Sequence, residues 1–207
     1  MRNECSFRGG NVLADSRKEE MADKKTVILK TTLELISEQG FVGTPMSQIA
    51  QRADIGMGTI YRYFKNKDDL LNALYINIKQ KIADCSRRSY PENLPAREAF
   101  KHILGNLIRY FKENPAELSF MEQYVNSPVI TAATREEAMR MAEPFEDLYR
   151  RAKEQNLLKE MPFEISCALL GGAAISLAKL YLASPDGLSE ESLAMGLDAL
   201  WDMIALK

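Results

Sequence analysis

The stretch from Thr44 to Lys67, TPMSQIAQRADIGMGTIYRYFKNK, constrains the fold more than any other part of this chain. Its pattern predicts two short helices joined by a tight turn. Thr44 is a good N-cap for the first helix, and Pro45 suits the first helical position, where a missing N–H costs nothing. Asp54 tolerates a left-handed backbone in the turn, and Gly56 can start the second helix without steric penalty. The stretch therefore predicts a helix-turn-helix unit.

The second helix, predicted from Gly56 or Met57 to Phe64, has an unusual composition. Ile60 and Phe64 lie four residues apart and form its inward apolar stripe. The other positions carry small, hydroxyl, aromatic and cationic groups, which donate to phosphates and contact base edges. These positions are Met57, Gly58, Thr59, Tyr61, Arg62 and Tyr63. The lack of a side chain at Gly58 predicts that a nucleic-acid backbone can approach the helix closely there.

A set of residues between positions 40 and 71 carries a resemblance to a known family. The set comprises Gly40-Phe41, Thr44, Ile49-Ala50, Gly58-Thr59-Ile60-Tyr61, Tyr63-Phe64, Lys67 and Leu70-Leu71. Together they resemble the DNA-binding domain of the TetR family of bacterial transcriptional regulators. One departure lies in the turn, where Gly56 stands in place of the usual serine. That change removes a hydroxyl that could cap the second helix and reach a phosphate.

The resemblance implies contacts with DNA at nine positions. They are Thr44, Ser47, Met57, Gly58, Thr59, Tyr61, Arg62, Tyr63 and Lys67. Arg62 is the best candidate for reading guanine, a contact that contributes about 1–3 kcal/mol of discrimination. If two copies of this helix enter successive major grooves about 34–36 Å apart, the operator is near-palindromic.

Composition favours a cytoplasmic protein. The chain has 207 residues, 46% of them hydrophobic, which is enough for a small domain and a medium one. We expect no transmembrane segment, because no continuous apolar run approaches about eighteen residues. The first residues lack the apolar core of a signal peptide. Three widely spaced cysteines, Cys5, Cys85 and Cys167, favour a reducing compartment and argue against a zinc site.

The charge distribution supports DNA binding only modestly. The whole chain carries a net charge of −2, whereas residues 21–85 hold nine cations and seven anions, a balance of +2. Placement is more informative than the balance, because four cations lie within the predicted DNA-facing segment. These cations are Arg52, Arg62, Lys65 and Lys67.

The chain divides into three predicted segments. Residues 1–22 mix glycine, polar and charged residues without periodicity, which predicts a disordered tail. The alternative for this tail is a basic arm formed by Arg2, Arg8, Arg17 and Lys18, and Met21 is an alternative start. Residues 23–68 form the helix-turn-helix domain, whose first helix runs from Asp23 to Gly40. Residues 69–207 form a helical ligand-binding and dimerisation domain, with a break at 89–95.

Helical periodicity continues through the third segment. It predicts helices around 70–84, 100–111, 114–125, 134–155, 163–183 and 193–204, with Asn114, Pro115 and Glu117 close to a capping box. The stretch 162–183 is apolar on nearly every side, so we expect it to be buried on two faces. The family resemblance implies that the last two helices of each subunit form a four-helix dimer bundle. The small residues at 171–174 would allow the close approach.

Aromatic and methionine residues of the third segment are candidates for a small-molecule cavity, because such sites are mostly apolar. Ordinary core positions are the competing interpretation. The candidates are Phe111, Phe120, Met121, Tyr124, Met141, Phe145 and Tyr149. With a single histidine and no G-x-S-x-G or dinucleotide-binding pattern, the sequence predicts no enzyme, no metal and no cofactor.

These patterns together predict an all-α protein that regulates transcription. The expected mechanism is a homodimeric repressor that a small apolar effector releases from operator DNA, with no membrane partner. The alternative is a helical protein-interaction module without DNA binding, which would show no salt-dependent binding to duplex DNA. The identity of the effector, the operator sequence and the choice between repression and activation stay open at this point.

Overall fold

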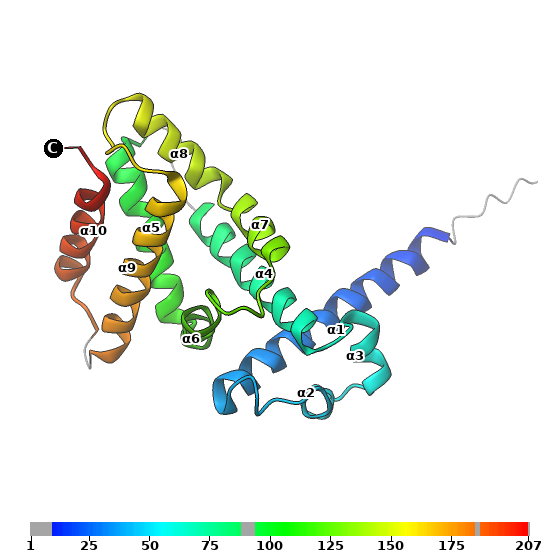
Figure 1. The fold of residues 1–207 in the computed structure, drawn as a ribbon. Helices are drawn as coiled ribbons and strands as arrows, with labels where there is room; N and C mark the ends of the chain where they lie inside the picture. Colours follow the sequence, from blue (N-terminus) through cyan, green and yellow to red (C-terminus); the bar gives the residue numbers. More distant parts are fainter. Residues whose placement is uncertain (1–9, 88–93, 185–186, 207) are drawn as a thin grey trace, which may run out of the picture. The chain divides into compact units, whose positions relative to one another are not determined.

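Helical periodicity is reproduced throughout the structure, a computed structural model that describes residues 10–87, 94–184 and 187–206. These residues form ten α-helices and no strand (Figure 1), which confirms the predicted all-α class. The chain divides into two units, Met1–Leu70 and Leu71–Lys207. This boundary lies close to the predicted end of the helix-turn-helix domain at residue 68.

The first helix, α1 (Gly10–Gln39), begins earlier than the sequence predicted. Residues 1–9 lie outside the described residues, and residues 10–22 belong to this helix, which differs from the disordered tail that the sequence predicts. Residues of high helix propensity make up most of the second half of this segment, even though its apolar periodicity is weak; they are Arg17, Lys18, Glu19, Glu20, Met21 and Ala22. The helix ends as predicted at Gly40, which has φ +74° and donates its N–H to the Ile36 carbonyl at 2.9 Å.

The helix-turn-helix consists of α2 (Met46–Arg52) and α3 (Met57–Tyr63). Asp54 in the turn has φ +52°, as predicted from its tolerance of the left-handed region. Ile60 and Phe64 are both buried, which confirms the inward stripe of α3. The predicted cap of α2 is wrong, because Pro45 and not Thr44 occupies the N-cap position.

The connecting helix α4 (Lys67–Arg87) begins in the first unit and continues into the second. Its start is capped reciprocally. The Asn66 side chain accepts from the Asp69 N–H at 2.8 Å, and the Asp69 carboxylate accepts from the Lys65 N–H at 2.8 Å. Asn66 therefore caps α4. Acidic residues in this first turn also complement the helix dipole.

The second unit is built around α5 (Ala96–Glu113). This helix packs against α6 (Pro115–Tyr124), α8 (Glu143–Glu154), α9 (Phe163–Ala183) and α10 (Glu190–Ile204), and Figure 1 shows it beside the last two. Phe100 is fully buried. Its ring lies 5.1 Å from that of Phe145 and 5.4 Å from that of Trp201 between centroids. Phe100 thus joins α5, α8 and α10 in one aromatic cluster.

The single helix predicted over 134–155 is wrong. The structure has two helices there, α7 (Ala132–Arg140) and α8, separated at Met141 and Ala142. Pro144 in the first turn of α8 explains the break, because proline lacks an N–H donor and clashes with the preceding turn of a continuous helix. The break brings Met141 and Ala142 to the lining of a cavity.

The described residues cover only one side of α9. Ser166, Leu170, Ala174 and Ala178 are buried, whereas Ile165, Leu169, Leu180 and Leu182 are exposed. The prediction of burial on two faces is therefore not met within one copy. By length and composition alone, with a mean hydropathy of 1.7, α9 is also long and apolar enough to cross a membrane. Glu164 and Lys179 interrupt the apolar run, which is why the sequence predicts no such segment.

The capping box predicted at the start of α6 is absent. Asn114 is the N-cap, but its side chain donates to the Tyr110 carbonyl at 2.8 Å. Glu117 is buried, accepts a hydrogen bond from the Tyr110 hydroxyl and pairs with Lys81 at 2.7 Å. Burial, and then the bond to Glu117, raise the pKa of Tyr110. This polar cluster ties α4, α5 and α6 together.

Candidate nucleic-acid interface and ligand cavity

The outer face of α3 is the candidate nucleic-acid interface. Because Ile60 and Phe64 point into the first unit, the opposite side of the helix faces solvent. Four predicted contact residues are exposed there, and Thr59 and Tyr63 are partly exposed. The exposed four are Met57, Gly58, Tyr61 and Arg62. A Cβ added at Gly58 would meet nothing within 4 Å, so only a partner could require glycine for close approach.

Two arginines of the helix-turn-helix differ in their availability. Arg52 donates two hydrogen bonds to the Glu38 carboxylate, at 2.7 and 3.1 Å, and this bond raises the pKa of Arg52. Arg62 makes no hydrogen bond or ion pair within the described part of the chain. Of these two arginines of the helix-turn-helix, Arg62 is therefore the one whose guanidinium is available to a partner. Free guanidinium groups recognise guanine and phosphate in a bidentate manner.

Thr44 does not lie on this surface. It is 0% exposed, its hydroxyl donates to the Gly40 carbonyl at 2.8 Å, and its N–H donates to the Phe41 carbonyl at 3.2 Å. Both of its donors are thus used within the turn before α2. Thr44 thus stabilises that turn, and its contact with DNA stays a prediction to which this burial lends no support.

Lys67 and Ser47 complete the predicted set. Ser47 on α2 is exposed. The Lys67 ammonium donates to the Phe41 carbonyl and lies 4.1 Å from the centroid of the Phe41 ring, and burial lowers the pKa of Lys67. It therefore fixes the start of α4 to the turn after α1. An ammonium has three donors, so this arrangement remains compatible with a phosphate contact.

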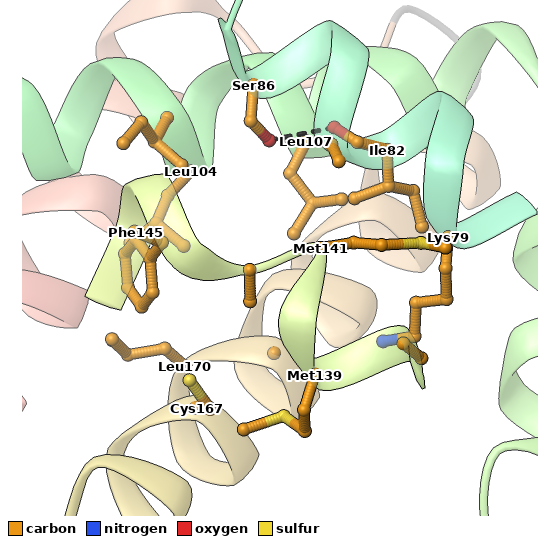
Figure 2. Close-up of a pocket in the computed structure, with 15 residues that line it drawn as sticks. Lys79, Ile82, Ser86, Leu104, Leu107, Met139, Met141, Phe145, Cys167 and Leu170 are labelled. Carbon is orange, nitrogen blue, oxygen red and sulfur yellow. Dashed lines mark hydrogen bonds between the residues drawn. The ribbon is translucent and has the colours of Figure 1, made fainter. Parts of the chain in front are cut away.

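The second unit contains a cavity of about 370 Å³ (Figure 2). This volume falls in the range of about 300–1,000 Å³ that is typical of small-molecule sites. The lining comes from α4, α5, α7, α8 and α9 and from the break between α7 and α8, and it is mostly apolar. It consists of Lys79, Ile82, Ala83, Ser86, Ile103, Leu104, Leu107, Ala138, Met139, Met141, Ala142, Phe145, Cys167, Leu170 and Gly171.

The structure brings only part of the predicted ligand set to this cavity. Met141 and Phe145 line it. Four others are buried among the helices outside the lining, namely Phe111, Phe120, Met121 and Tyr149. Tyr124 is partly exposed and its ring lies 5.0 Å from that of Phe120. The contacts of all seven with a ligand stay a prediction.

Sequence reasoning missed the contributions of α4 and α9 to the lining. On α4 the lining residues are Lys79, Ile82, Ala83 and Ser86, which recur at the spacing of one helical face. A lysine on this otherwise apolar face was the available signal. On α9 the signal was weaker, because almost every position is apolar and no periodicity selects Cys167 or Leu170.

Lys79 is the charged residue of the lining. It makes no hydrogen bond or ion pair within the described ranges, although its ammonium lies 5.6 Å from the centroid of the Tyr75 ring. Burial lowers the pKa of Lys79, since desolvation disfavours the ammonium. The nearby Cys167 is no counterion at neutral pH, because burial raises the pKa of its thiol to about 11.

Replacing Lys79 with methionine is expected to stabilise the unliganded protein, by less than the about 1–3 kcal/mol of a fully buried unsatisfied donor, because Lys79 is only partly buried. Because the folded chain holds the proton less tightly than the unfolded chain, the cost is fully present below the folded pKa. It fades as the pH rises toward the ordinary value of 10.5. Urea denaturation at pH 7 and pH 9 tests this, and a variant less stable than wild type at pH 7 would contradict it.

An exposed helix-turn-helix face joined by a continuous helix to a unit with an apolar cavity defines a class of DNA-binding transcriptional regulators. Residues 28–74 match the family described as bacterial regulatory proteins, tetR family. Residues 95–205 match the tetracyclin repressor-like C-terminal domain. The chain belongs to the tetR family, and its function is therefore regulation of transcription and not enzymatic catalysis.

Individual relatives agree with this assignment. An HTH-type transcriptional regulator of Haemophilus influenzae is 31% identical over 101 residues, which are 49% of this chain and 54% of that relative. The HTH-type transcriptional repressor KstR of Mycobacterium tuberculosis is 28% identical over 69% of this chain and 71% of its own. A solved tetR family regulator from Shewanella sp. PV-4 has a TM-score of 0.84 at 25% identity, covering 89% of this chain and 99% of that one.

Proposed function

We propose that this protein is a homodimeric cytoplasmic repressor that binds a near-palindromic operator and is released by a small-molecule effector. The observation that carries the DNA-binding part is the exposed face of α3, where Arg62 makes no hydrogen bond or ion pair within the described residues, whereas Arg52 is paired with Glu38. The proposed contacts with DNA are Ser47, Met57, Gly58, Thr59, Tyr61, Arg62, Tyr63 and Lys67. Repression is supported by the relative KstR, which is a transcriptional repressor.

The proposed dimer forms through the uncovered side of α9 together with α10. Ile165, Leu169 and Leu180 of α9 and Met195 of α10 are all exposed apolar side chains, and α9 packs against α10. A Cβ at Gly171 or at Gly172 would meet nothing within 4 Å, so the helix backbone is open to close approach there. Burial of such a surface against a second copy is favourable.

The proposed coupling between ligand and DNA runs along α4. Four cavity residues lie on this helix, whose first residues belong to the DNA-binding unit. Asn72 of α4 donates to the Val129 carbonyl at 2.9 Å and accepts from the Thr131 N–H at 3.0 Å. These bonds connect α4 to the segment before α7, and α7 itself lines the cavity. A ligand shifts such an equilibrium only through different affinities for the two states.

Selection of random duplex DNA by the purified chain, at two salt concentrations, tests DNA binding. We expect a near-palindromic motif and a strong loss of affinity at the higher salt concentration, because phosphate contacts release counterions. An absence of enrichment at low salt would contradict DNA binding and favour a protein-interaction module.

Arg62→Ala is expected to relax sequence preference at one position of each half-site. Loss of a bidentate contact with guanine corresponds to about 1–3 kcal/mol. Arg52→Ala is the matched control, because it removes the same charge from an arginine already paired with Glu38. The same selection, repeated with both variants, provides the measurement. Unchanged preference with Arg62→Ala would show that Arg62 does not read a base.

A further inference from the structure

The charge pattern of the cavity points to a ligand class. We propose that the cavity binds a small apolar molecule carrying one carboxylate, and that Lys79 binds this carboxylate. The inference rests on the proposed function, because it takes this cavity to be the effector site. Figure 2 shows Lys79 of α4 among the lining side chains, together with Met139 of α7 and Cys167 of α9.

The cavity holds an ammonium but no anion to balance it. Apart from Lys79, its lining side chains carry no formal charge, and the raised pKa of Cys167 keeps this thiol neutral. The Tyr75 ring, at 5.6 Å, stabilises the ammonium without neutralising it. Lys79 is partly buried, and a charge that is withdrawn from water is ordinarily paired or hydrogen-bonded. The missing partner therefore has to come from solvent or from a ligand.

A carboxylate satisfies this ammonium better than other ligand groups do. It accepts short charge-assisted hydrogen bonds, which are stronger than those to a neutral amide or hydroxyl. A cationic ligand would be repelled. A neutral ligand would displace water from the ammonium without supplying an opposite charge. The cavity therefore discriminates between ligands by the sign of their charge as well as by their shape.

The remainder of the ligand must be apolar and of moderate size. Ser86 is the hydroxyl of the lining, and its proton is already donated to the Ile82 carbonyl at 2.9 Å (Figure 2). Most other lining residues are aliphatic or sulfur-containing side chains. A water-sized group occupies roughly 30 Å³, so a cavity of about 370 Å³ holds on the order of a dozen such groups.

Calorimetric titration of the full chain tests the proposal with two matched pairs, octanoate with octanamide and 2-naphthoate with 2-naphthamide. Each pair keeps the apolar body and changes only the charge. We expect at least one carboxylate to bind the wild-type protein tenfold or more tightly than its amide. Equal affinities within both pairs, or binding of neither carboxylate, would overturn the proposal.

Variants assign the effect to Lys79. Lys79→Met is expected to reduce the preference for the carboxylate at least tenfold, and Lys79→Arg to retain it. Lys112→Met removes the same charge from an exposed lysine that lies over Tyr181, outside the lining, and should leave the preference unchanged. A carboxylate preference that survives in Lys79→Met would overturn the assignment. Circular dichroism confirms that each variant is folded.

Operator binding, measured on the same samples, separates this proposal from the proposed function. A carboxylate that binds through Lys79 but leaves operator affinity unchanged supports the ligand class and contradicts the release mechanism. Operator binding without any carboxylate preference overturns the ligand class and leaves the DNA-binding proposal standing.

Discussion

Replacing Phe100 with alanine is expected to lower the free energy of unfolding of the second unit by about 3–5 kcal/mol, the cost of truncating a buried phenylalanine. The side chain is fully buried and its ring contacts those of Phe145 and Trp201. Alanine at this position loses apolar burial, leaves a cavity and removes both ring contacts. Because these residues belong to α5, α8 and α10, one substitution weakens the packing of three helices.

Tryptophan fluorescence during urea denaturation measures this effect. The chain has one tryptophan, Trp201, and its ring lies 5.4 Å from that of Phe100, so the signal reports on the second unit. Phe163→Ala is the matched control, because Phe163 is only partly buried at the edge of the same cluster. We expect a clearly smaller loss for the control. Similar losses for the two variants would contradict a core centred on Phe100.

Leu180→Asp is expected to convert the proposed dimer to a monomer and to weaken operator binding by roughly 10²–10⁴-fold, the contribution of linking two binding modules. Leu180 is 52% exposed on α9, so aspartate at this position has little effect on folding of one copy. In a dimer the carboxylate would be buried against apolar side chains without a partner, which is strongly unfavourable.

Sedimentation equilibrium and operator titration measure the two effects. Leu157→Asp provides the control, because Leu157 is also an exposed leucine, at 37%, but lies outside α9 and α10. It should remain dimeric and bind the operator normally. A Leu180→Asp protein that stays dimeric would place the dimer contact elsewhere. A monomeric wild-type protein that partitions into lipid vesicles would instead assign the apolar side of α9 to a membrane.

Local sequence signals predicted the helix-turn-helix and the residues next to it well. The left-handed Asp54, the buried pair Ile60 and Phe64 and the end of α1 at Gly40 all depend on residues within about one helical turn. Such features follow from backbone preference and helical spacing, so they can be read directly from the chain. The family match came from this same local pattern.

Other features depend on neighbours that the sequence does not place. Arg52 and Arg62 look equivalent in the sequence, but Glu38, fourteen residues before Arg52, pairs with it and leaves Arg62 available. Thr44 is of a residue type that commonly caps a helix at the surface, yet the turn that follows α1 buries it completely. The environment of Arg52 is set by pairing with another helix, and that of Thr44 by the way the turn folds.

The sequence by itself thus determined the helical class, the helix-turn-helix and the inward face of α3, because short-range spacing decides them. Only the tertiary structure decided which side chains meet in the cavity. Lys79 and Cys167 come from helices far apart in the chain, and their lining neighbours Met141 and Phe145 flank Pro144, which interrupts the predicted helix. The shape of a cavity and the pairing of its charges arise from long-range packing, which no local period encodes.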